Sequence, residues 1–292
     1  MRMILVTGGT GTTGSEIIKR LAEAGAKQVR ALVRNPEKAA FIREAGFETI
    51  EGDFERPETL GAALEGVERA LLLTAPDPLT VEHQRGFIEA AKRAGTRHVV
   101  KLSAIGADAG APEGIGKWHG QAEDELKASG LAWTMIQPNA FMQNLLGQAR
   151  TIAEEGAIYQ PVGDGRTSFV DARDIAAVAA KVLVEDGHEG KSYVVTGPEA
   201  LSYAEIAEKL SAATGRPVKY VSITPEAFRK GALAAGLPEW LVDALGVLNE
   251  NFAAGNWSRV TNVVREVGGR EPTTFDRFAR DYAGAFGGGG RS

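Results

Sequence analysis

Short apolar runs alternate with amphipathic segments through the first half of the chain. Strands are predicted at Met3–Thr7, Gln28–Val33, Glu48–Glu51, Ala70–Thr74, His98–Leu102 and Ala132–Ile136. Helices are predicted between them, at Gly14–Ala24, Pro36–Ala45, Pro57–Leu64, Val81–Ala94 and Lys117–Ala128. This alternation predicts an α/β fold with a parallel sheet covered on both faces, because each right-handed crossover places its helix on one face.

The first predicted strand runs directly into a glycine-rich turn with the sequence GGTGTTG at residues 8–14. A helix follows, with Ile17, Ile18 and Leu21 on one face. A bound pyrophosphate needs a tight chain reversal, close approach of the backbone and a helix N-terminus directed at the anion. A strand, a glycine turn and a helix in this order distinguish a dinucleotide fingerprint from a chance glycine spacing. We therefore expect a Rossmann-type doubly wound sheet of strand order 3-2-1-4-5-6, with the ligand crevice beside this turn.

The alternation loosens after about residue 150. A turn is predicted at residues 163–165, helices at Asp171–Glu185, Ser202–Thr214 and most of 226–254, and a strand at Tyr193–Val195. We expect a Rossmann NAD(P)-binding domain at residues 1–155, with 167–188 packing back on it. A smaller helix-rich C-terminal substrate lobe is expected at 189–286, laid over the carboxyl edge of the sheet, and a disordered low-complexity tail at 287–292.

The composition narrows the class of protein further. The 292 residues include 33 basic and 38 acidic side chains, so no bulk charge attracts nucleic acid or an anionic membrane. There is no cysteine, and the four histidines have no metal-ligand spacing, so no metal site is expected. No apolar run approaches the roughly 18 residues of a membrane span. We expect a soluble, cytoplasmic protein.

A basic cluster follows the second predicted strand, in the sequence RNPEK at residues 34–38. NAD-preferring sites usually have an acidic residue here, which accepts a hydrogen bond from the ribose 2′-hydroxyl, whereas this chain has Arg34. Asn35 can cap a helix that begins at Pro36, and Arg34 and Lys38 then flank a helix N-terminus that attracts anions. The cluster therefore favours a 2′-phosphate, and so NADP(H) over NAD(H). A solvated basic turn is the alternative.

Further motifs extend from residue 3 to about residue 283: TGGTGTTG (7–14), VRNP (33–36), GDF (52–54), HGQAE (119–123), SGLAWT (129–134), PNAFMQN (138–144) and FVDARD (169–174). In these segments the chain resembles the NmrA-like atypical short-chain dehydrogenases/reductases. Within that group it is most similar to the NADPH-dependent quinone, azo-dye and triphenylmethane-dye reductases.

The resemblance implies which residues hold a dinucleotide. Asp53 and Phe54 would lie by the adenine, and Arg34 by the 2′-phosphate. The nicotinamide-side ribose would lie by the loop residues Thr74, Ala75 and Pro76, and the phosphates by Gly8, Thr10, Gly11, Thr12, Thr13 and Gly14. Two alternatives stay open: Asp53 caps the turn before the next helix, and residues 74–78 form an ordinary loop.

One motif of the parent group is absent. Ordinary short-chain dehydrogenases use Tyr-x-x-x-Lys, in which the lysine lowers the tyrosine pKa so that the phenol can transfer a proton. When the chain is registered on Glu123 and on Ser129-Gly130, Ile115 occupies the tyrosine place and His119 the lysine place. A tyrosine-driven alcohol dehydrogenase is therefore disfavoured.

His119 and Ser103 are the remaining candidates for catalysis. His119 has an ordinary pKa near neutrality, roughly 6.5, and is the best proton donor left. A structural pair with Glu123, four residues along the same helix, is the alternative. Ser103 follows the fifth strand, where the parent group has a serine that polarises the substrate carbonyl. Lining the nicotinamide site and capping the loop are the alternatives for Ser103.

A substrate wall is predicted after the sixth strand. Pro138, Asn139, Phe141 and Met142 are expected to face the nicotinamide, and Trp118 offers a flat surface for an aromatic substrate. The alternative is that Phe141 and Met142 are core residues.

The expected function is an NADPH-dependent oxidoreductase that transfers a hydride to a quinone, azo or related conjugated aromatic acceptor without the tyrosine–lysine relay. Such acceptors are electrophilic, and the protein's part is to hold the nicotinamide against them. A monomer or homodimer is expected. The main alternative is a non-catalytic NADP(H)-binding redox sensor of the NmrA type. Ile115 and His119 disfavour a third class, the reductases or isomerases of sugars and isoflavonoid-like substrates.

Overall fold

In the computed structural model, residues 2–288 are described, and they form two compact units. The first contains residues up to 138 together with 172–195 and 263–270, and the second contains 139–171, 196–262 and the segment from 271. These boundaries differ from the predicted domains because the chain leaves the first unit at 138 and returns to it twice, for a helix and a strand at 172–195 and for a short helix at 263–270. Of the predicted tail at 287–292, residues 289–292 lie outside the described residues.

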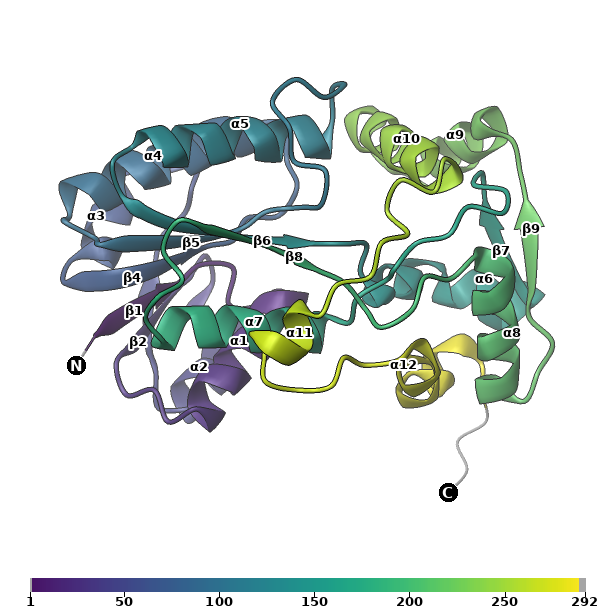
Figure 1. The fold of residues 1–292 in the computed structure, drawn as a ribbon, viewed down its shortest axis with the longest axis horizontal. Coiled ribbons are helices and arrows are strands. Elements are labelled where there is room, and N and C mark those ends of the chain that lie inside the picture. Colours follow the sequence, from purple (N-terminus) through teal and green to yellow (C-terminus); the bar gives the residue numbers. More distant parts are fainter. Residues whose placement is uncertain (1, 289–292) are drawn as a thin grey trace. The chain divides into compact units, whose positions relative to one another are not determined.

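The first unit is built on a seven-stranded parallel sheet (Figure 1). Its strand order is β3-β2-β1-β4-β5-β6-β8, which confirms the predicted 3-2-1-4-5-6 and adds one strand beside β6. The strands are β1 (Met3–Val6), β2 (Val29–Val33), β3 (Glu48–Glu51), β4 (Val67–Leu72), β5 (His98–Leu102), β6 (Ala132–Pro138) and β8 (Lys191–Val195). The carboxyl ends of β1 and β4 therefore lie side by side at the topological switch point.

The fourth strand corrects the prediction of Ala70–Thr74, because β4 begins three residues earlier and ends at Leu72. The apolar pattern did not predict this start, because Glu68 and Arg69 are polar residues. Arg69 is nevertheless fully buried. Its guanidinium donates hydrogen bonds to the carbonyls of Val182 and Leu183, where a helix ends. A long-range partner thus makes a buried arginine compatible with a central strand.

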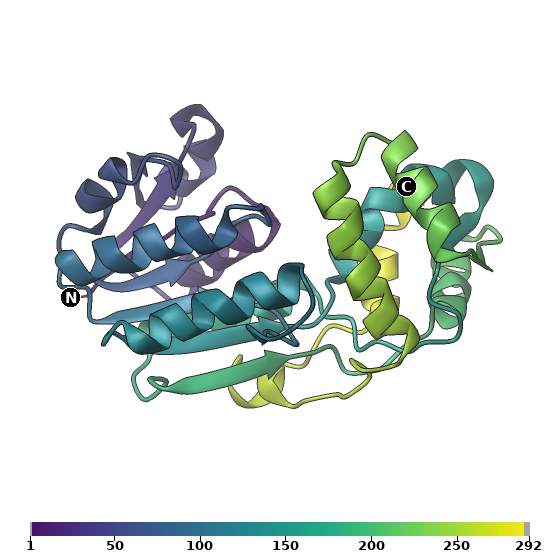
Figure 2. The same cartoon turned by 90° about the horizontal axis from the view of Figure 1, so that it is seen from above.

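Helices cover both faces of this sheet (Figure 1). On one face lie α3 (Glu58–Leu64), α4 (Thr80–Arg93) and α5 (Ile115–Ala128), and Figure 2 shows α4 and α5 running side by side. On the other lie α1 (Thr12–Glu23), α7 (Ala172–Val184), α11 (Val263–Glu266) and α2 (Ala40–Glu44), which follows the 3₁₀ turn η1 (Pro36–Ala39). Ile17, Ile18 and Leu21 are buried, as the helical periodicity predicts.

The second unit is mostly helical. It contains η2 (Met142–Gln148), α6 (Ala149–Glu155), α8 (Tyr203–Thr214), α9 (Pro225–Ala234), α10 (Glu239–Ala253), α12 (Phe275–Asp281) and η3 (Ala283–Phe286). Two short parallel strands, β7 (Ala157–Gln160) and β9 (Lys219–Ser222), pair with each other. The predicted turn at residues 163–165 is present, with a hydrogen bond from the Gly165 N–H to the Val162 carbonyl. Among the described residues, no helix has the length and apolarity to span a membrane.

Candidate functional site

The glycine turn after β1 is closed by contacts that require glycine. The Gly11 N–H donates a hydrogen bond to the Gly8 carbonyl at 3.0 Å, and Gly8 has a φ of +65°, which suits a residue without Cβ. A Cβ at Gly14 would overlap the Gly8 carbonyl oxygen. The first turn of α1 is therefore held directly against the end of β1, as close helix–strand packing requires.

The N-terminus of α1 is suited to an anion. Gly11 occupies the N-cap position without a side chain to satisfy the backbone N–H groups of the first turn. Thr10, Gly11 and Thr12 are exposed, whereas Thr13 and Gly14 are buried. Exposed N–H groups and the positive end of the helix dipole together favour a phosphate. The residues at this turn thus fit the pyrophosphate of a dinucleotide.

Thr7 connects this turn to the loop after β4. Its hydroxyl accepts the Leu73 N–H at 2.8 Å and lies within hydrogen-bond distance of the Leu73 carbonyl at 2.9 Å. The next residue, Thr74, accepts a hydrogen bond on its hydroxyl from the buried Gln84 at 2.8 Å. The two contacts hold the start of the loop that contains Ala75 and Pro76 beside the glycine turn.

The basic cluster after β2 has the predicted cap. The Asn35 side chain accepts the Glu37 N–H at 2.8 Å, and Pro36 is the first residue of the 3₁₀ turn. Arg34 and Lys38 are exposed, and neither forms an ion pair within residues 2–288. Two cations at a capped turn, without acidic partners, are available to an anionic group such as a 2′-phosphate.

Asp53 and Phe54 follow β3 on the same edge of the sheet. The Asp53 carboxylate accepts the Glu55 N–H at 3.2 Å, which is the local turn contact of the alternative interpretation. Phe54 is partly buried, with its ring 5.8 Å from that of Phe87 on α4. The adenine-side role of both residues stays a prediction.

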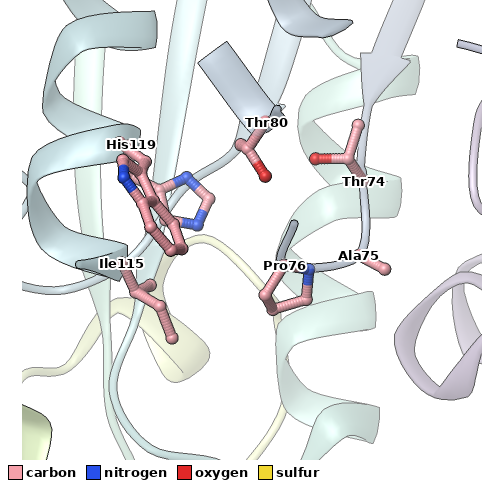
Figure 3. A pocket seen from close by; sticks show the side chains of 7 residues that line it. Thr74, Ala75, Pro76, Thr80, Ile115 and His119 are labelled. Carbon is pink, nitrogen blue, oxygen red and sulfur yellow. The ribbon is translucent and has the colours of Figure 1, made fainter. Parts of the chain in front are cut away.

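A small pocket lies between the loop after β4 and the first turns of α4 and α5 (Figure 3). It is lined by Thr74, Ala75, Pro76, Thr80, Ile115, Trp118 and His119. Figure 3 shows the His119 ring directed toward the space beside Pro76 and Thr80. The residues at the tyrosine and lysine places of the parent group, Ile115 and His119, thus both line this pocket.

A buried lysine lies behind His119. The Nζ atom of Lys101, on β5, is 2.7 Å from Nδ1 of His119, and Lys101 is 0% exposed. Burial lowers the pKa of Lys101 to about 7, opposed in part by the negative charge of Glu123. Burial, and secondarily the charge of Lys101, hold the pKa of His119 well below its ordinary value. His119 is therefore a neutral imidazole at neutral pH.

Lys101 was not among the sequence candidates. The sequence nevertheless indicates it, because this lysine lies between Val100 and Leu102 inside a predicted strand that has a predicted neighbouring strand on each side in the sheet. A central parallel strand is buried on both faces, so a charged residue within it needs a specific partner.

Ser103 is buried and belongs to a second polar cluster. Its hydroxyl donates to Oε1 of Glu123 at 2.6 Å, and the Gln137 amide donates to the same oxygen at 2.8 Å. Lys127 donates to Oε2 of Glu123 at 3.2 Å. Glu123 is therefore held by Ser103 and its neighbours, while His119 is paired with Lys101 instead. The predicted role of Ser103 toward a substrate stays a prediction.

The predicted substrate wall is divided between the two units. Pro138 ends β6, and its carbonyl accepts the Ile105 N–H at 2.9 Å. Trp118 donates its indole N–H to Glu113 at 2.6 Å. In the second unit, Asn139 is buried and donates to Ser168 at 2.8 Å, Phe141 is partly buried, and Met142 belongs to that unit's apolar core.

Within residues 2–288, no three His, Asp or Glu side chains are arranged to hold a metal ion.

Comparisons with known proteins show the family of this chain. Residues 8–186 match the model of a family described as NAD(P)H-binding. An NAD(P)H azoreductase of Xenophilus azovorans is 46% identical over 98% of this chain and 99% of its own length. A (4-alkanoyl-5-oxo-2,5-dihydrofuran-3-yl)methyl phosphate reductase of Streptomyces griseus is 37% identical over 97% of this chain and 99% of its length.

The fold has a solved counterpart. The NADPH complex of the Escherichia coli quinone oxidoreductase QOR2 superposes with a TM-score of 0.89 at 30% identity, covering 96% of this chain and 99% of that one. The resemblance predicted from the sequence is confirmed. The chain belongs to the NAD(P)H-binding family, and it is similar to an azoreductase in sequence and to a quinone oxidoreductase in sequence and fold.

Proposed function

We propose that this protein is an NADPH-dependent reductase that transfers a hydride to a quinone, azo or related conjugated aromatic acceptor. The observation that carries the proposal is the pocket beside the loop after β4, where His119 and Ile115 occupy the places of the usual lysine and tyrosine. The similarity to an azoreductase and to a quinone oxidoreductase supports the same class of acceptor.

The site divides the chemistry between cofactor and protein. The bound dinucleotide supplies the hydride. The glycine turn and the N-terminus of α1 hold its phosphates, and the loop at Thr74–Pro76 lies along its nicotinamide side. Ile115 makes one wall of the pocket apolar and cannot donate a proton. His119 is the titratable side chain that reaches the pocket and the proposed proton donor.

The preference for NADPH over NADH is the finer part of the proposal. Arg34 and Lys38 are exposed and have no described acidic partner, so both are free to bind a 2′-phosphate. Arg34→Glu is expected to weaken NADPH binding by about 1.5–3 kcal/mol, the contribution of a charged hydrogen bond, and to leave NADH binding nearly unchanged. Arg93→Glu, at the exposed end of α4, is the control. Unchanged NADPH affinity of Arg34→Glu in a fluorescence titration would refute the preference.

A second candidate function is a redox sensor that binds NADP(H) without turnover. The observation in its favour is the absence of the tyrosine–lysine pair from the pocket, since Ile115 has no proton to transfer. Oxidation of NADPH, followed by its absorbance with a panel of quinones, azo dyes and triphenylmethane dyes, separates the two. Turnover of at least one acceptor supports the reductase, and tight NADPH binding without any turnover supports the sensor.

A further inference from the structure

We propose that Lys101 and His119 form a proton relay, in which His119 touches the acceptor and Lys101 is the positioning residue that supplies the proton from behind it. This inference rests on the proposed reductase function. It assigns a role to Lys101, which lies 18 residues before His119 in the sequence and on a different element.

The geometry defines the direction of the relay. Lys101 Nζ lies 2.7 Å from His119 Nδ1, so Nδ1 is the inner nitrogen of the ring. His119 lines the pocket, and Nε2 is therefore the nitrogen available to a bound acceptor (Figure 3). Lys101 is completely buried and does not line the pocket, whereas the imidazole that it contacts does. A lysine ammonium that donates to Nδ1 requires the tautomer with the proton on Nε2, which is the donor form facing the acceptor.

The protonation states agree with this direction. A neutral imidazole by itself is a weak acid, and burial keeps the pKa of His119 well below its ordinary value. Burial also lowers the pKa of Lys101 to about 7, so its ammonium releases a proton close to neutral pH. A pKa near the working pH is what efficient proton transfer requires.

The charged surroundings of the pair are few. Glu123, on α5, is the carboxylate that favours the charged form of Lys101, and it is itself held by Lys127, Ser103 and Gln137. On α4, the neutral Thr80 lines the pocket, and the neutral Gln84 donates to Thr74. The outer pair of Arg85 and Glu125 joins α4 to α5.

The step balances for an azo acceptor. The acceptor gains two electrons as the hydride from reduced nicotinamide at one nitrogen, and the N=N π bond breaks. The other nitrogen takes the proton from His119 Nε2, while Nδ1 takes a proton from Lys101. The imidazole remains neutral with its proton moved to Nδ1, and Lys101 becomes a neutral amine. After product release, a solvent proton entering at Nε2 returns the Nδ1 proton to Lys101.

The test compares two acceptors in the Lys101→Met variant. An azo dye needs a hydride and a proton, whereas a cationic triphenylmethane dye becomes neutral by accepting the hydride alone. The ratio of azo to cation turnover is expected to fall by about a hundredfold in the variant, the usual contribution of a general acid. The same exchange at the exposed Lys92 is the matched control and should leave the ratio unchanged.

The pH profile and the solvent isotope effect provide readouts that loss of packing would not move. In the wild type, azo turnover should fall as pH rises above about 7, where Lys101 loses its proton, and cation turnover should not follow that curve. Azo turnover should also slow in heavy water. An equal loss of both acceptors, or an unchanged ratio, would overturn the relay. A wild-type protein that reduces neither acceptor would instead refute the proposed function.

Nitrogen-15 NMR of the cofactor-free protein tests the pair without turnover. His119 is expected to carry its proton on Nε2 at pH 6 and to shift toward the Nδ1 tautomer as Lys101 deprotonates. Lys101→Met should abolish that shift. Identical histidine spectra in the two proteins across this range would overturn the relay, even if the reductase activity is found.

Discussion

Replacing Lys101 with methionine is expected to change how the stability of the protein depends on pH. The lysine is 0% exposed, and its Nζ contacts Nδ1 of His119. Burial lowers its pKa from the ordinary 10.5 to about 7. Between these two values the unfolded chain binds a proton at this lysine that the folded protein does not, so the free energy of unfolding rises with pH.

The magnitude follows from the two pKa values. Each pH unit of the depression corresponds to about 1.4 kcal/mol, so the fall from 10.5 to about 7 amounts to about 5 kcal/mol. This contribution is complete above pH 10.5 and is lost as pH falls to about 7. Lys101→Met removes the titration and keeps an apolar stem of similar length. The variant should therefore be most stable relative to the wild type at and below pH 7.

The assay is urea unfolding of both proteins between pH 6 and pH 10. The charge of Lys101 also lowers the pKa of His119, whose ordinary pKa is about 6.5, so the difference between the two free energies of unfolding is read above pH 7, where it reports Lys101. This difference should shift in favour of the wild type as pH rises above 7. A difference that stays constant across the range would mean that Lys101 keeps its ordinary pKa despite its burial.

Two further predictions concern stability and the cofactor turn. Burial lowers the pKa of His98 to about 4, so the free energy of unfolding should decrease by up to about 3 kcal/mol as pH falls from 6.5 to 4. Urea unfolding of His98→Gln should not show this decrease. An equal decrease in both proteins would contradict the prediction. Gly14→Ala should abolish NADPH binding or folding, because its Cβ would overlap the Gly8 carbonyl, as calorimetry and circular dichroism can show. Gly61→Ala is the control, because its Cβ would point into open space on α3, and it should add up to about 1 kcal/mol of stability. A Gly14→Ala protein that binds NADPH normally would contradict the assignment of the turn.

Local patterns were sufficient for much of the fold. The strand order and the glycine turn were predictable because hydrophobic periodicity and turn residues act over a few neighbouring positions. The cap formed by Asn35 and Pro36 is equally local, and the structure contains it. The start of β4 was not predictable in this way, because the pairing that buries Arg69 comes from the end of α7, more than a hundred residues later.

The candidate site shows the same division. The sequence by itself determined the dinucleotide turn, the basic residues after β2 and the exchange of the tyrosine–lysine motif for Ile115 and His119. Only the tertiary structure decided that His119 contacts Lys101 and that Glu123 contacts Ser103. The spacing of four residues along one helix had instead suggested a contact between His119 and Glu123. The packing of β5 and the residue after it near α5 brings Lys101 to His119 and Ser103 to Glu123. Burial then determines which of these side chains can carry a charge.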